Sequence, residues 1–180
     1  MNKASYDKSG LLQLKDASKG FPSQRPVGIL KWTFSSTSDE MVPLKINCWP
    51  EEESRGQMNV SIEYSMDVKH MELMGVRIRI PLGTSESPVI LNMDGTHRHN
   101  ASAQEMIWEL DLIDSSNSSG SLEFTIAQKN ADAFFPISVS FESTKLFCNL
   151  DVASVRSADG SVPIQYGLQK SMGADEYLIE

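Results

Sequence analysis

The sequence predicts an all-β protein built as a β-sandwich. Short stretches in which apolar and polar residues alternate recur at intervals of roughly 8 to 15 residues, and turn-forming residues separate them. Few stretches show the spacing of an amphipathic helix, and neither heptads nor long repeats are present. Roughly ten to twelve short strands are therefore expected within 180 residues, which is a length typical of one domain.

The clearest strand is predicted at residues 105–112, where acidic and apolar residues alternate at period two. One-sided burial of this kind is typical of an antiparallel sheet, and Trp108 is the expected core anchor. Residues 115–120 form a turn and residues 121–127 alternate again, so the two runs are predicted to pair as a hairpin. The side chains expected to face the core are Met106, Trp108, Leu110 and Leu112.

The first part of the chain is expected to begin with a loosely ordered lead-in at residues 1–27, followed by a strand at residues 27–34. Residues 41–49 alternate, and Pro43 and Pro50 place this strand near an edge or a bend. An acidic loop is expected at residues 51–57. The side chains expected on one side of the strands at 41–49 and 58–66 are Val42, Leu44, Ile46 and Cys48, then Met58, Val60, Ile62, Tyr64 and Met66.

The strand predicted at residues 74–82 carries two basic residues on its polar side. Its apolar side is expected to be Met74, Val76, Ile78 and Ile80. Because side chains alternate along a strand, Arg77 and Arg79 project together from the opposite face.

The remaining strands follow in shorter pieces. Further strands are expected at 87–93, 96–99, 134–141, 146–155, 162–169 and 176–179, with a turn at Asp94-Gly95.

Composition excludes several classes of function. The net charge of −8 and the pI near 4.9 argue against nucleic-acid binding, which needs clustered positive charge. Cys48 and Cys148 lie far apart without a CxxC partner, so two free, buried thiols in a reducing compartment are expected. No apolar run approaches the length of a membrane span and no secretory signal begins the chain, so a soluble cytosolic protein is expected.

No residues form a convincing catalytic or metal-binding motif, so neither enzymatic activity nor a cofactor is predicted. His97 and His99 lie on one side of a strand, but spacing places no third ligand, and exposed strand histidines are the favoured interpretation. Asp111 and Asp114 resemble the acidic pair of a glycosidase, but such carboxylates need raised pKa values in a cleft, and these two are expected in a solvated strand and turn. The GxSxG, P-loop, GxGxxG and HExxH motifs are absent.

Arg77 and Arg79 form a local basic stripe in an acidic protein, and they are the predicted binding residues. Arginine stems pack against aromatic side chains while the guanidinium groups pair with carboxylates, so a short acidic-aromatic peptide suits this stripe. The alternative is that the two arginines only keep the strand solvated.

Several stretches across nearly the whole chain resemble the μ-homology domain of the coatomer delta family. They are GILKW at 28–32, PLKINCWP at 43–50, RIPL at 79–82, MDG at 93–95, IWEL at 107–110, SSGSLEF at 118–124 and FFPISV at 134–139. The run INCWP together with SGSLEF makes the resemblance specific to delta rather than to adaptor medium chains in general.

The resemblance implies an elongated pair of β-sandwich lobes, one inserted into the other. Residues 41–143 would form the inserted lobe, residues 1–40 the lead-in and first strands of the outer lobe, and residues 144–180 its return strands. The domain would be truncated at its amino end, and the exposed edge would favour a homo-oligomer.

The resemblance also implies a function in a cytosolic coat on Golgi membranes and vesicles, in transport from the Golgi to the endoplasmic reticulum. The implied partners are other coatomer subunits and disordered tryptophan-motif segments of tethering and GTPase-activating proteins. Tyr166 and Leu168 stand where clathrin-adaptor medium chains carry the Trp and Arg that hold tyrosine signals, which argues against binding of such signals. The alternative function is a structural spacer that reads no peptide.

Overall fold

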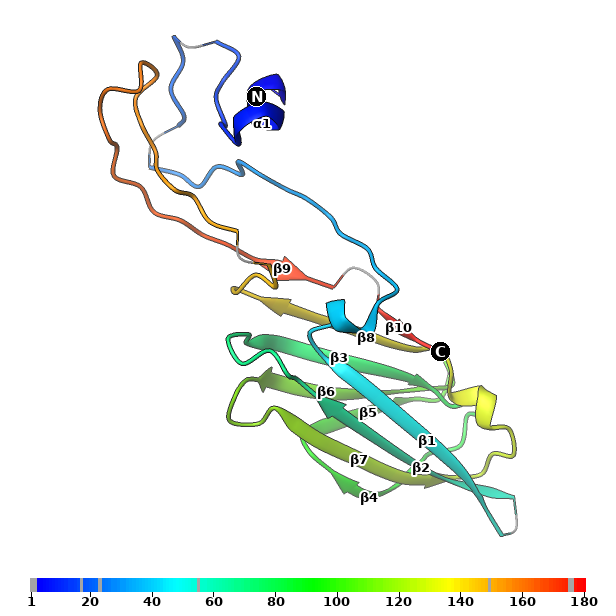
Figure 1. Ribbon diagram of the computed structural model, residues 1–180. Coiled ribbons are helices and arrows are strands. Elements are labelled where there is room, and N and C mark those ends of the chain that lie inside the picture. The colour runs from blue at the N-terminus through cyan, green and yellow to red at the C-terminus, as the bar shows by residue number, and fades with distance from the viewer. Residues whose placement is uncertain (1–2, 17, 23, 55, 149, 175–176) are drawn as a thin grey trace. The chain divides into compact units, whose positions relative to one another are not determined.

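The computed structural model describes residues 3–16, 18–22, 24–54, 56–148, 150–174 and 177–180 (Figure 1). The chain divides into two compact units. The first combines Met1–Thr37 with Leu150–Leu168, and the second combines Ser38–Asn149 with Gln169–Glu180. The predicted inserted lobe at 41–143 is a different division and stays a prediction.

The first unit contains one helix, α1 (Lys3–Ser9), and otherwise irregular backbone in its described residues. The strands predicted at 27–34, 146–155 and 162–169 are therefore wrong over the residues described. Near the last two segments the structure has only an isolated bridge, between Arg156, just after the segment 146–155, and Pro163, which has no N–H with which to extend a ladder. In residues 27–34 no neighbouring strand covers the apolar side chains, and Trp32 is 45% exposed.

Among the residues that the structure describes, no helix has the length and apolar character that a membrane span requires.

The second unit is made of two antiparallel sheets, which confirms the all-β sandwich (Figure 1). One sheet has the order β1-β2-β7-β4 and the other β10-β8-β3-β6-β5, with β9 also paired to β8. The strands are β1 (Lys45–Glu53), β2 (Gln57–Ser65), β3 (Leu73–Pro81), β4 (Val89–Met93), β5 (Thr96–Asn100), β6 (Glu105–Ile113), β7 (Ser119–Ile126), β8 (Ile137–Ser143), β9 (Met172–Gly173) and β10 (Leu178–Ile179). Two 3-10 turns, η1 (Asp39–Met41) and η2 (Ala131–Phe134), precede β1 and β8.

Trp108 of β6 is fully buried in the core, as predicted. Its indole Nε1 donates a hydrogen bond to the carbonyl of Asp94, and its ring lies 5.6 Å from the ring of Tyr64. Tyr64 belongs to β2 in the other sheet, so this aromatic contact joins the two layers. Tyr64 Oη in turn donates to the carbonyl of Asn117, 3.1 Å away.

The alternation of β3 and β6 changes phase at one end, so two of the predicted core residues face solvent. Met74 and Leu112 lie opposite each other and are 38% and 43% exposed, whereas Leu73 and Ile113 are paired and buried. Gly75 has φ +57°, and the register between β3 and β8 shifts between Met74 and Arg77. This bulge reverses which side chains point inward, and the period-two pattern could not reveal it.

The predicted hairpin between residues 105–112 and 121–127 is also wrong. β6 pairs with β3 and β5, while β7 pairs with β2 and β4 in the other sheet. The connecting loop crosses from one layer to the other, and Asn117 organises it by accepting from the amide of Asp114 and donating to the carbonyl of Leu112. In sequence, a polar loop that crosses between two layers has the same composition as the tight turn of a hairpin, so the two could not be distinguished.

Smaller differences concern the ends of strands and the cysteines. β1 extends into the predicted acidic loop as far as Glu53, and it is an edge strand, which accommodates Pro50. Both cysteines are free as predicted, but only Cys48 is partly buried and Cys148 is exposed.

Candidate functional site

Arg77 and Arg79 project from the outward face of β3, as the alternation predicts. Their side chains are 52% and 46% exposed. The residues that alternate with them, Val76, Ile78 and Ile80, are buried and pack β3 against the core. The two guanidinium groups are therefore attached to a rigid central strand of the sheet rather than to a loop.

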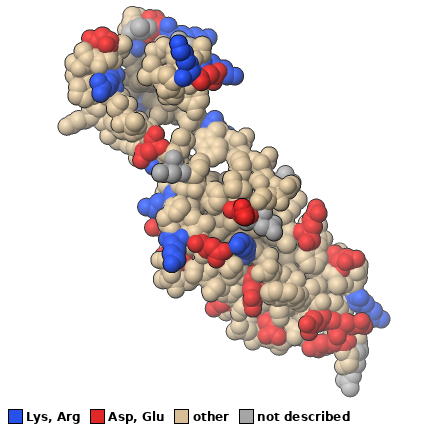
Figure 2. Space-filling model, viewed as in Figure 1, with Lys and Arg blue, Asp and Glu red and all other residues tan. Residues whose placement is uncertain are grey.

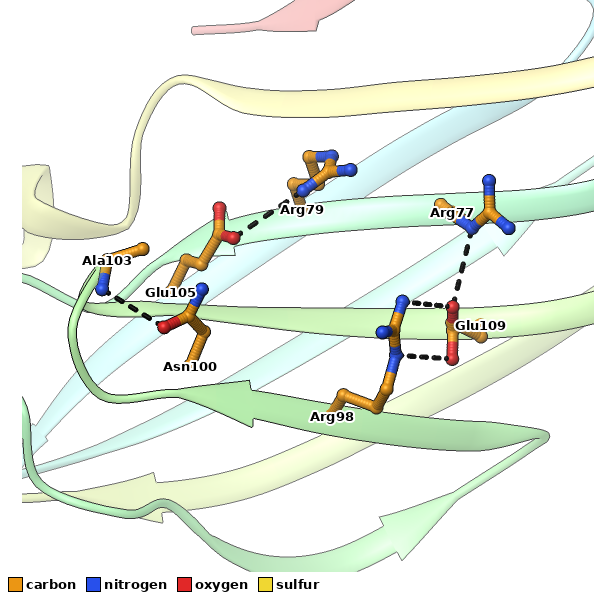
Figure 3. A network of polar contacts seen from close by, with 7 residues as sticks. All are labelled: Arg77, Arg79, Arg98, Asn100, Ala103, Glu105 and Glu109. Atoms are coloured by element: carbon orange, nitrogen blue, oxygen red, sulfur yellow. Dashed lines mark hydrogen bonds and ion pairs between the residues drawn. The ribbon is translucent and has the colours of Figure 1, made fainter.

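Each of these arginines faces a carboxylate of β6 (Figure 3). Nε of Arg77 lies 3.4 Å from Oε1 of Glu109, and Nη1 of Arg79 lies 3.5 Å from Oε1 of Glu105. Contacts of this length between half-exposed groups contribute little to stability. The arginines can therefore exchange these partners for another carboxylate at small cost.

Arg98 of β5 is a third arginine on this face, and it was not among the binding residues predicted from the sequence. It donates to both oxygens of Glu109, from Nε at 3.0 Å and from Nη2 at 2.8 Å (Figure 3). The hydrogen bond from Arg98 is the main cause that lowers the pKa of Glu109, and Arg77 lowers it further. The short connection between residues 96–99 and 105–112 could have indicated this contact, because strands that follow each other closely in sequence usually pair.

On the other side of β3, short side chains extend the surface toward β10. Ser140 lies opposite Arg77 and Ser138 opposite Arg79, both half-buried on β8. Leu178 of β10 pairs with Ser138 and is 45% exposed. We name Arg77, Arg79, Ser138, Ser140 and Leu178 the arginine surface, which combines two cations, two hydroxyl groups and one apolar side chain.

The other candidates from the sequence do not join this surface. His97 and His99 lie on β5 but are half-buried rather than exposed as predicted, and no group of three metal-ligating side chains exists within the described residues. Hydrogen bonds from Ser116 lower the pKa of Asp114, the opposite of what a general acid needs.

Tyr166 and Leu168 lie in the first unit, on irregular backbone, and are 45% and 42% exposed. Tyr166 Oη donates to the carbonyl of Val152. The strand on which a tyrosine signal would pair is thus absent from the described residues 162–169.

Comparisons with known proteins place this architecture in a family. The model of the adaptor complexes medium subunit family matches residues 6–180. The chain is 37% identical over 179 residues to "Probable coatomer subunit delta" of Caenorhabditis elegans and 34% identical over 180 residues to "Coatomer subunit delta" of Dictyostelium discoideum. These alignments cover 99% and 100% of the chain but 34% and 32% of the relatives, so the chain spans about a third of their length.

Two solved structures share the fold over 99% of the chain, each with a TM-score of 0.77. One is the yeast delta-COP-I mu-homology domain, 28% identical, of which 73% is covered. The other is the same yeast domain complexed with the Dsl1 WxWxV peptide, 27% identical, of which 74% is covered. The predicted resemblance is confirmed.

Proposed function

Because the chain belongs to the adaptor complexes medium subunit family, we propose that it is a peptide-binding domain of a vesicle coat subunit. The observation that carries this proposal is the shared fold with a yeast domain solved with a WxWxV peptide. The chain would dock tryptophan-bearing segments of tethering and GTPase-activating proteins, beside other coatomer subunits. It would act in Golgi-to-endoplasmic-reticulum transport on the cytoplasmic face of Golgi membranes, without a cofactor or catalytic step.

The spacing of the WxWxV motif favours an extended peptide. Two tryptophans and a valine at alternate positions project from the same side of a β-strand, while the residues between them face the other way. An aromatic side chain buries about 150 to 250 Å², so two tryptophans supply most of the favourable free energy. Ordering a disordered segment offsets much of it, and an affinity on the order of micromolar is expected.

We place the acidic flank of such a peptide on the arginine surface. Arg77 and Arg79 are half-exposed and make only long contacts with Glu109 and Glu105, so a peptide carboxylate can replace those partners. The short side chains of Ser138 and Ser140 leave room beside them for an extended backbone. Leu178 offers apolar surface at the end of the row.

The alternative is a structural spacer that packs within the coat and reads no peptide. Calorimetric titration of the chain with a synthetic WxWxV peptide carrying an acidic flank separates the two functions. Saturable heat, lost when both tryptophans of the peptide are replaced by alanine, supports the peptide-binding domain. Absence of saturable heat at high peptide concentration contradicts it and leaves the spacer.

A further inference from the structure

The outward face of the four-stranded sheet carries an exposed tryptophan among carboxylates. Trp49 stands on the edge strand β1 and is 47% exposed. Pairing places Ser61 of β2 opposite Trp49, and Glu123 of β7 opposite Ser61. We name Trp49, Ser61 and Glu123 the Trp49 row. From it we propose that this face docks an extended, arginine- or lysine-bearing segment of a partner protein, with one cation over Ser61.

The geometry of the row suits a cationic side chain. Neighbouring strands are about 4.8 Å apart, so the Trp49 and Glu123 backbones stand roughly 10 Å from each other. Ser61 between them has only a short, half-buried side chain. A guanidinium or ammonium group over Ser61 can contact the indole face on one side and the carboxylate on the other. Cation–π attraction is strongest for tryptophan among the aromatic side chains.

The carboxylate of Glu123 is held in place. Asn59 Nδ2 of β2 donates to Oε1 of Glu123 at 3.0 Å, and Glu123 is itself half-buried on β7. A carboxylate fixed in this way loses little side-chain entropy when it accepts a cation. An unrestrained surface glutamate would lose more.

The charge of the whole face favours a basic partner. Glu51 of β1 and Glu63 of β2 lie on the same outward side as Trp49, and both are exposed. The one basic residue within β1, β2, β4 and β7 is Lys45, which pairs with Asp67 at 2.7 Å. Figure 2 shows acidic side chains gathered near the end of the unit where β1 turns into β2.

The same charges disfavour the other occupants. Nucleic acid and anionic lipid carry phosphates, which four strands with this charge repel. A second copy of this chain, with a net charge of −8, is repelled as well. Apolar side chains at the other end of the sheet, Val89 and Leu91 of β4, are 61% and 55% exposed, so the partner segment can also carry apolar residues.

This surface is separate from the arginine surface, because the two belong to different sheets and have opposite charge. An arginine-bearing peptide and an acidic WxWxV peptide would therefore occupy their two surfaces of the chain at the same time without competing. Failure of one proposal leaves the other unaffected.

The test is a calorimetric titration with the blocked peptide Arg-Ser-Arg-Ser-Arg, whose arginines face one side when extended, and with Glu-Ser-Glu-Ser-Glu as its matched control. Saturable binding of the basic peptide alone is expected. Trp49→Ala should weaken the affinity for the basic peptide by about fivefold or more, and Trp49→Phe should weaken it less. Glu123→Gln should have an effect between these two. Trp32→Ala removes a tryptophan of similar exposure in the first unit and should change nothing.

Equal loss of affinity in Trp49→Ala and Trp32→Ala would overturn the proposal, because charge attraction alone would then explain the binding. Absence of saturable heat with the basic peptide would also overturn it. Dimerisation seen by light scattering and abolished by Trp49→Ala, without peptide binding, would overturn it in favour of a second copy. Unfolding midpoints of all variants in urea confirm that each retains its fold.

Discussion

Arg98 and Glu109 form a two-point ion pair across β5 and β6, with Nε–Oε2 and Nη2–Oε1 distances of 3.0 and 2.8 Å. Glu109 Oε1 also receives the longer contact from Arg77 at 3.4 Å. Since the planar guanidinium of Arg98 matches both carboxylate oxygens, it holds Glu109 more firmly than Arg77 does. The pair therefore leaves Arg77 with the weaker hold on this carboxylate.

Replacing Arg98 by glutamine should raise the pKa of Glu109 toward its ordinary value of 4.5, because the hydrogen bond from Arg98 is the main cause that lowers it. A carboxyl with a depressed pKa in the folded state contributes stability above its unfolded pKa. That contribution disappears as pH falls below 4.5 and through the depressed value. NMR titration of the Glu109 carboxyl carbon measures the shift, and Arg79→Gln, whose partner is Glu105, is the control. An unchanged titration in Arg98→Gln would contradict the assignment.

Arg77→Glu combined with Arg79→Glu should weaken binding of an acidic WxWxV peptide and reverse its salt dependence. In the parent chain salt screens an attraction, whereas in the double variant it would relieve a repulsion. Calorimetry at low and high salt measures both effects. Arg25→Glu with Lys31→Glu changes the net charge equally in the first unit and serves as the control. If the two double variants behave alike, the arginine surface has no role in binding.

The sequence was sufficient to predict most strands of the second unit, because their inward side chains alternate over most of each strand. β2 is the clearest example, since Met58, Val60, Ile62 and Tyr64 are all buried. The exposed face of β3, with Arg77 and Arg79, followed from the same rule. These features depend only on local periodicity, which sequence records directly.

Features that depend on pairing could not be predicted in the same way. Gly75 shifts the phase of β3, and although a glycine inside a strand often marks a bulge, the alternation of apolar and polar residues alone does not show the shift. The contact of Arg98 with Glu109 requires the register of β5 on β6. The apolar residues of 27–34 looked like a strand, but an isolated run cannot form a ladder without a partner.

Trp108→Ala should lower the free energy of unfolding by about 3 to 5 kcal/mol, as truncations of large buried aromatic residues do. The substitution leaves a cavity, breaks the contact with Tyr64 and removes the donor to the Asp94 carbonyl. Urea unfolding measures the loss. Trp49→Ala, at an exposed site, should shift the midpoint far less, and equal shifts would be inconsistent with the core position of Trp108.

The two thiols should differ in reactivity toward iodoacetamide. Burial raises the pKa of Cys48 to about 12, so very little thiolate forms at neutral pH, and the side chain is only partly accessible. Cys148 is exposed and should be alkylated first. Mass spectrometry of the native chain at short reaction times should find the label on Cys148, and unfolding in urea should equalise the two rates. Faster labelling of Cys48 would contradict its burial.

Gly95→Ala should destabilise the sandwich more than Gly75→Ala, although both glycines have positive φ, +82° and +57°. Either alanine must adopt a left-handed conformation, which costs about 1 to 2 kcal/mol. A Cβ at Gly75 meets open space, whereas one at Gly95 would lie 2.5 Å from the carbonyl oxygen of Glu109. That oxygen is backbone of β6 and cannot move without disturbing the ladder to β5, so the collision adds to the conformational cost. Urea unfolding of the two variants separates the effects: the difference between their midpoints reports the collision, and equal midpoints would mean that the turn between β4 and β5 does not lie against β6 as described.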